Sequence, residues 1–91
     1  MKQILKFTLA PVITLELPKD AQVLTVRAQG EDICLWALVD PKAEKEPRKF
    51  MAFGNGHNVP EPHEGPQITL KYRGSAHLDG GALVFHVFEV I

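Results

Sequence analysis

The stretch QVLTVRAQGEDICLWALV, residues 22–39, decides the fold. In its first half apolar residues alternate with polar ones, which is the period-two pattern of a half-buried β-strand. Gly30, Glu31 and Asp32 then form a turn signal, and residues 33–39 are apolar on both faces. The pattern predicts two strands, the second of them central, covered on both sides, and with Trp36 as its largest contributor to burial.

The same alternation continues on both sides of this stretch, with Gly, Pro and Asp at short intervals. The strands it predicts occupy residues 2–9, 13–17, 22–29, 33–39, 48–53, 67–78 and 82–90. Asp79-Gly80-Gly81 is a hairpin signal, and Gly74 indicates a bulge or twist point. We therefore expect an all-β fold, a small single-domain antiparallel sandwich or partly open barrel of about seven strands.

Two segments between these strands read as loops. Residues 40–47 are charged and bounded by prolines, so we expect them to form a solvated loop. A second loop of about a dozen residues contains Pro60, Pro62 and Pro66, and it is long for so small a domain.

Composition places the chain among ordinary globular domains. It has 91 residues, 45% of them hydrophobic and 23% charged, so we expect one domain over residues 1–91 with its own core. The formal charge of −1 gives no support for nucleic acid binding. Cys34 is the single cysteine and fits a reducing compartment. No apolar run is long enough for a membrane span or an uninterrupted signal sequence, so we expect a cytoplasmic protein.

Several blocks, taken in order, resemble a family of short phage and prophage proteins of unknown function. The blocks are ILKF (4–7), LPKDAQVLTVRAQ (17–29), CLWALVDP (34–41), FGNGH (53–57) and GGALVFHVFE (80–89). The family's loop usually has Thr where Asn55 stands. The resemblance spans nearly the whole chain and implies a phage origin, but it carries no known activity and so no catalytic residues.

The stretch FGNGHN, residues 53–58, is the sharpest candidate binding site. Gly54 and Gly56 permit conformations in which successive backbone N–H groups point into one concavity that binds anions, and His57 could add a charged donor. Asn55-Gly56 is equally a common turn dipeptide. The two alternatives are a ligand site made of Gly54, Asn55, Gly56 and His57, and a simple turn.

The four histidines His57, His63, His77 and His86 lack the spacing of metal ligands, so we predict no metal site and no cofactor. His86 lies on a strand face with apolar neighbours. It is either hydrogen-bonded across the sheet within the core or part of a ligand-lining face.

The candidate nucleophiles are Ser75 and Cys34, and neither lies in a recognisable catalytic pattern. The carboxylate pairs Glu44 and Glu46, and Glu61 and Glu64, sit in charged or proline-rich loops where solvation explains them. We therefore predict that the protein is not an enzyme.

Together these features give three hypotheses about function. The first is a non-enzymatic phage accessory protein that binds a host protein in the host cytosol, for host takeover or counter-defence. The second is a protein that sequesters a nucleotide or other anionic small molecule with the Gly54 to His57 loop. The third is a structural component of the virion. The sequence gives no information on the oligomeric state.

Overall fold

The strands form where the alternating pattern places them. A computed structural model describes residues 1–59 and 69–91. Its strands are β1 (Gln3–Leu9), β2 (Val12–Pro18), β3 (Gln22–Gln29), β4 (Asp32–Val39), β5 (Lys45–Gly54), β6 (Leu70–Leu78) and β7 (Leu83–Val90), with a short 3-10 turn, η1 (Asp79–Gly81). None of the described segments is a helix that could cross a membrane. The predicted all-β class is confirmed.

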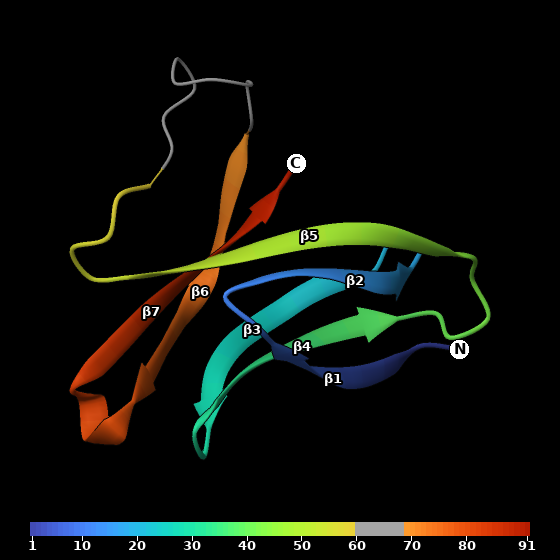
Figure 1. The fold of residues 1–91 in the computed structure, drawn as a ribbon. Coiled ribbons are helices and arrows are strands. Elements are labelled where there is room, and N and C mark those ends of the chain that lie inside the picture. Colours follow the sequence, from blue (N-terminus) through green and yellow to red (C-terminus); the bar gives the residue numbers. More distant parts are fainter. Residues whose placement is uncertain (60–68) are drawn as a thin grey trace.

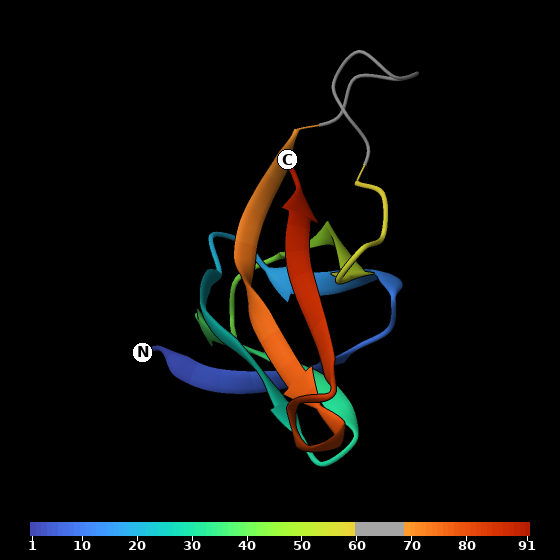
Figure 2. The same ribbon diagram turned by 90° about the vertical axis from the view of Figure 1, so that its left-hand side faces the viewer.

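The strands form two antiparallel sheets that pack face to face. Sheet A has the order β1-β4-β3, and sheet B has the order β2-β5-β7-β6. The long strand β5 pairs with β2 along its first part and with β7 along its second part (Figure 1). Figure 2 shows β6 and β7, orange and red, crossing the blue strands β1 and β2. The sheets form the predicted sandwich, and they do not close into a barrel.

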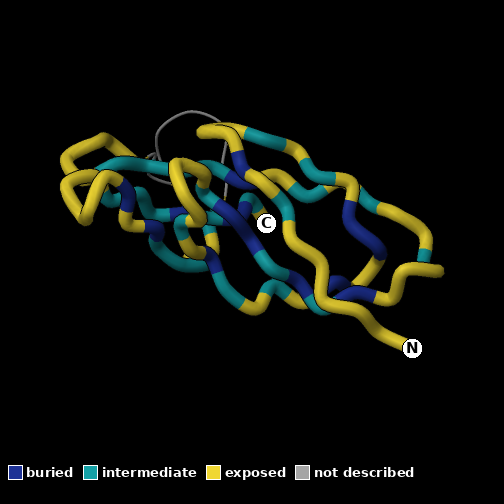
Figure 3. Tube along the Cα trace, turned by 90° about the horizontal axis from the view of Figure 1, so that it is seen from below, coloured by how far each residue is buried: buried dark blue, intermediate teal, exposed yellow. Residues whose placement is uncertain are grey.

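The core lies between the facing sides of the two sheets. Both sheets supply its fully buried side chains, including Leu35 and Val39 from sheet A and Leu17, Phe50 and Val87 from sheet B. Figure 3 shows buried positions alternating with more exposed ones along the strands. This alternation arises because successive side chains of a strand point to opposite faces, and only the inner face of each sheet is covered.

The two sheets approach each other closely where β3 lies beside β6. Gly74, in β6, has φ 150°, and the pairing of β6 with β7 shifts register between Tyr72 and Gly74. A side chain at Gly74 would place its Cβ 3.1 Å from the Cβ of Val26. The predicted bulge at Gly74 is therefore confirmed, and it allows β6 to pack against β3.

The hairpin predicted at Asp79-Gly80-Gly81 is also confirmed. These residues form η1, which joins the antiparallel strands β6 and β7. All three have positive φ, with values of 51°, 61° and 93°. The glycines adopt this conformation without the steric penalty that a Cβ would bring.

Strand β5 starts earlier than the sequence pattern predicts. We expected residues 40–47 to be a loop, but β5 begins at Lys45 and includes Pro47, which lies opposite Glu16 of β2. The pairing with β7 begins only at Lys49, so β5 has one neighbouring strand at Pro47. A proline is tolerated there because its missing N–H can face the unpaired side. The expected loop around Pro60, Pro62 and Pro66, with His63, Glu61 and Glu64, and the expected start of a strand at Gln67 lie outside the described residues.

Strand β4 has sheet B on one side only, whereas the sequence predicted cover on both sides. Strand β4 is the central strand of sheet A, as expected, and Leu35 and Ala37 are fully buried. Trp36, however, is only partly buried, because its side of the strand faces away from sheet B. Two layers of sheet can cover one face of β4 and not both.

We expect Gly74→Ala to destabilise the protein more than Gly30→Ala. Gly30 has φ 61° and open space where a Cβ would lie, whereas Gly74 combines φ 150° with the close approach of Val26. The backbone conformation alone should make Gly74→Ala unfavourable by about 1 to 3 kcal/mol. Urea denaturation of both variants measures the difference. Equal losses would contradict the role of Gly74 in sheet packing.

Candidate functional site

Strand pairing brings a group of aromatic side chains together on the outer side of sheet B. Phe53 of β5 lies opposite His86 of β7, and Phe88 of β7 lies between Met51 of β5 and Tyr72 of β6. These five residues share one side of the sheet, facing away from sheet A. We call them the aromatic face.

The rings of the aromatic face contact one another edge to face around Phe88. The ring centroid of Phe88 lies 5.2 Å from that of Tyr72 and 5.8 Å from that of Phe53, with interplanar angles of 71° and 70°. Such pairs stabilise by about 0.5 to 1.5 kcal/mol beyond the area they bury. The contacts therefore hold the rings in a defined arrangement on the surface.

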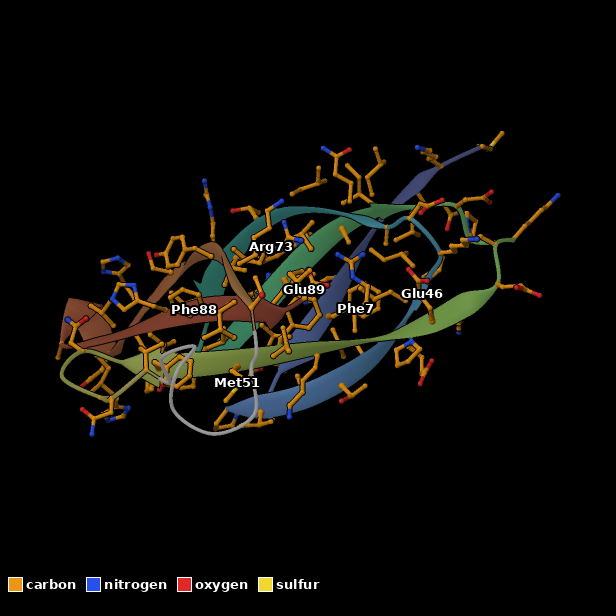
Figure 4. The ribbon with its side chains drawn as sticks, turned by 90° about the horizontal axis from the view of Figure 1, so that it is seen from above. Phe7, Glu46, Met51, Arg73, Phe88 and Glu89 are labelled. Atoms are coloured by element: carbon orange, nitrogen blue, oxygen red, sulfur yellow. The ribbon has the colours of Figure 1, made fainter. Side chains whose placement is uncertain are left out.

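This surface is partly open to solvent, and Met51, Phe53, His86 and Phe88 are half-buried. Tyr72 is 51% exposed, and Val12, which lies opposite Met51 on β2, is 54% exposed. Exposed apolar side chains that lie side by side are a typical feature of an interaction site. Figure 4 labels Met51 and Phe88, which come from the adjacent strands β5 and β7.

His86 connects the aromatic face to the FGNGHN loop. Its Nε2 lies 2.8 Å from Oδ1 of Asn55, and its Nδ1 lies 3.1 Å from the hydroxyl of Tyr72. Because Oδ1 of Asn55 can only accept, Nε2 carries the hydrogen and Nδ1 accepts from Tyr72. His86 is thus hydrogen-bonded across the sheet, as one of the two alternatives proposed, but on the outer face and not within the core.

The hydrogen bonds of the FGNGHN loop are largely satisfied within the fold. The backbone N–H of Gly54 donates to Nδ1 of His57, that of Asn55 to the carbonyl of Val84, and that of His57 to the carbonyl of Gly54. An anion nest needs successive N–H groups that point at the ligand. Of the four candidate residues only Gly56, with φ 81°, has its N–H outside these bonds, so the geometry favours a turn. The ligand site remains a prediction.

A group of three charged side chains lies on the inner side of sheet B. Glu89 of β7 is 3% exposed, and its carboxylate accepts hydrogen bonds from Arg48 of β5 and Arg73 of β6. Arg48 binds both carboxylate oxygens, at 2.6 and 2.8 Å, and also donates to the carbonyl of Ala21. Arg73 donates twice to Oε1, at 3.0 and 2.6 Å (Figure 4). We call these residues the ion triad.

The ion triad perturbs the acid–base equilibria of its members. Burial raises the pKa of Glu89, but the hydrogen bonds and positive charges of Arg48 and Arg73 outweigh it, so the pKa lies below its ordinary value. The hydrogen bond to Glu89 raises the pKa of Arg48. Glu89 is therefore a carboxylate at neutral pH, and it carries its charge inside the sandwich.

The sequence carries a signal for Glu89 that was not among the predicted site residues. In LVFHVFEV, residues 83–90, Glu89 has the same parity as Phe85 and Val87. A charged residue at a core-facing position requires a partner of opposite charge. The partners could not be identified from the sequence, because Arg48 lies 41 residues away.

Among the described residues, neither Ser75 nor Cys34 is hydrogen-bonded to a base. Ser75 lies opposite His86 in the pairing of β6 with β7, but both ring nitrogens of His86 are engaged by Tyr72 and Asn55. Cys34 is a free thiol and is 2% exposed. On the outer side of sheet B, the hydrogen bonds of His86 hold the side chains of Tyr72 and Asn55 in place.

Comparison with known proteins identifies the family of the chain. A family model described as "Domain of unknown function (DUF7352)" matches residues 1–91, so the chain belongs to this family. Comparison with curated proteins gives no match, and comparison with solved structures gives none either.

We expect Glu89→Gln to lower the free energy of unfolding at neutral pH by about 3 to 5 kcal/mol, the range for breaking a buried ion pair. Because the pKa of Glu89 is lower in the folded state, its contribution is complete above the unfolded value of about 4.3. That contribution is lost as the pH falls through the folded value. Urea denaturation from pH 7 to 3 should show the wild type and variant converging in acid. Glu16→Gln, on an exposed position of β2, is the control.

We expect His86→Phe to lower stability by about 1 kcal/mol, because the variant keeps an aromatic ring but loses the bonds to Tyr72 and Asn55. Ser75→Ala is the matched control on the neighbouring strand. Denaturant unfolding measures both. A His86→Phe variant as stable as the wild type would mean that the hydrogen bonds contribute nothing to the fold.

Proposed function

We propose that this member of the DUF7352 family is a non-enzymatic phage accessory protein that acts by binding, and that a host protein docks on its aromatic face. The phage assignment rests on the resemblance of blocks such as CLWALVDP (34–41) and GGALVFHVFE (80–89). The proposed binding role rests on the side chains of the aromatic face, on the outer side of sheet B. This binding would serve host takeover or counter-defence.

The observation that carries the proposal is the exposed but immobilised ring of Tyr72. The side chain is 51% exposed, yet its ring contacts Phe88 and its hydroxyl is bonded to His86. Protein interfaces are enriched in Tyr, Phe and Met, and tyrosine is among the residues that contribute most to binding. An anchor already held in place loses little conformational entropy when a partner binds.

The non-enzymatic part of the proposal is supported by the surroundings of the nucleophiles. Ser75 lies near an imidazole whose nitrogens are both engaged, and Cys34 is buried. A free buried thiol is also compatible with the reducing cytosol of a host cell, which is the proposed place of action.

Binding of an anionic small molecule is a second candidate. A small hollow is lined by Gly54, Asn55, His57 and residues 82–85, which places three of the predicted ligand residues around one space. Binding through a protonated His57 would however break the bond that its Nδ1 accepts from Gly54. We therefore favour the protein partner.

We expect Tyr72→Ser and Phe88→Ser each to weaken binding to the host partner at least tenfold, as for central interface residues. The partner would be captured from host lysate on the tagged full chain, purified, and titrated by calorimetry. Tyr72→Phe should retain most of the affinity, because it keeps the ring and loses one hydroxyl.

Ile4→Ser is the matched control, since Ile4 is 62% exposed and lies on sheet A. A partner that binds Tyr72→Ser and Phe88→Ser as tightly as the wild type does not use the aromatic face. Loss of affinity only in His57→Ala and Gly56→Ala would favour the loop as the binding site.

A further inference from the structure

The geometry points to a second docking surface, on the outer side of sheet A, which binds an acidic peptide segment and seats an apolar side chain of that segment against Trp36. This inference goes beyond the proposed function, because it concerns the opposite side of the sandwich and a partner of different chemistry. It would make the protein an adaptor between two partners.

A shallow apolar hollow lies at the centre of this surface. It is lined by Ile4 of β1, Leu24 and Thr25 of β3, Arg27 of β3 and Trp36 of β4. Ile4 is 62% exposed and Leu24 is 44% exposed. Sheet B packs on the other side of sheet A, so no described element covers the hollow. Large aliphatic and aromatic side chains around a hollow form the kind of pocket that receives an apolar anchor residue.

Two cations lie beside the hollow, at its β3 side. Lys6 of β1 lies opposite Trp36, and Arg27 of β3 lies opposite Cys34, two residues along β4. Lys6 donates to the side chain of Gln29, and Arg27 forms no ion pair with another described residue. No carboxylate is among the described residues that line the hollow. The surface is therefore complementary to a segment that carries carboxylates beside an apolar residue.

The same features argue against a nucleic acid as the occupant. Binding of a single strand needs a track of cations and several aromatic platforms, because each base stacks on its own ring. Among the described residues, Trp36 is the one aromatic side chain that lines the hollow, and the formal charge of the chain is −1. One anchor site with two cations beside it matches a short acidic peptide.

The two surfaces can be occupied at the same time. The aromatic face is the outer side of sheet B, and the hollow is on the outer side of sheet A. The core of the sandwich separates them, and none of the described residues that line the hollow belongs to sheet B. Binding at one surface should therefore leave the other intact, and the two can be tested separately.

Selection from a display library of short random peptides on the immobilised full chain tests the inference without a choice of sequence in advance. We expect enrichment of peptides that combine Glu or Asp with Leu, Ile or Phe. Synthetic versions should change the fluorescence of Trp36, the single tryptophan, and should bind more weakly as salt concentration rises.

Substitutions then locate the peptide. Arg27→Gln, Lys6→Gln and Leu24→Ser should each weaken binding by about threefold to tenfold, in keeping with partly exposed contacts. Lys49→Gln, a charge removal on sheet B, and Tyr72→Ser on the aromatic face should leave it unchanged. Circular dichroism confirms that each variant is folded.

Three results would overturn the inference. One is enrichment of peptides with no preference for acidic residues. Another is binding that depends on Tyr72 and not on Arg27, which would assign the peptides to the aromatic face. The third is tighter binding of a single-stranded oligothymidine than of any selected peptide. The peptide site is tested by substitutions on sheet A, and the host-protein site by substitutions on sheet B. A negative result for one site is therefore distinguishable from a negative result for the other.

Discussion

The structure of sheet B depends on the burial of one carboxylate. Glu89 is almost completely removed from water, and a carboxylate in that position is unfavourable unless cations and hydrogen-bond donors replace its hydration. Arg48 and Arg73 supply both, and Arg48 also holds the turn between β2 and β3 through Ala21. The ion triad thereby joins β5, β6, β7 and that turn. A shift of any of these strands would leave a charge unpaired within the sandwich.

With the inner side of sheet B fixed in this way, its outer side becomes a stable platform. Because side chains alternate along β7, Val87 and Glu89 face the interior, and His86 and Phe88 must face outward. The contacts among the aromatic rings and the hydrogen bonds of His86 then restrict the rotamers of the side chains on this surface. Sheet A has a different outer side, with one indole, aliphatic side chains and the cations Arg27 and Lys6. The proposed host-protein site and the inferred peptide site therefore lie on surfaces of different chemistry.

Much of the fold could be predicted from the sequence, and less of the candidate site. The strands and the hairpin at Asp79–Gly81 were predicted because alternation and glycine preference are local properties. The outward orientation of Trp36 was not evident from the sequence, since an apolar strand looks the same whether one face or both are covered. The ligand role of Asn55 stays a prediction, and its hydrogen bond with His86, which lies 31 residues away, could not be predicted.

By itself, the sequence determined the class of structure and the positions of most of its turns, because each depends on neighbouring residues. Only the tertiary structure decided which residues meet. The alternating pattern places Glu89 on the core-facing side of its strand, but the pairing of β7 with β5 and β6 brings two arginines to it. The same pairing assembles Phe53, Tyr72 and Phe88 on the outer side. Contacts between distant strands depend on strand order and register, which no local pattern specifies.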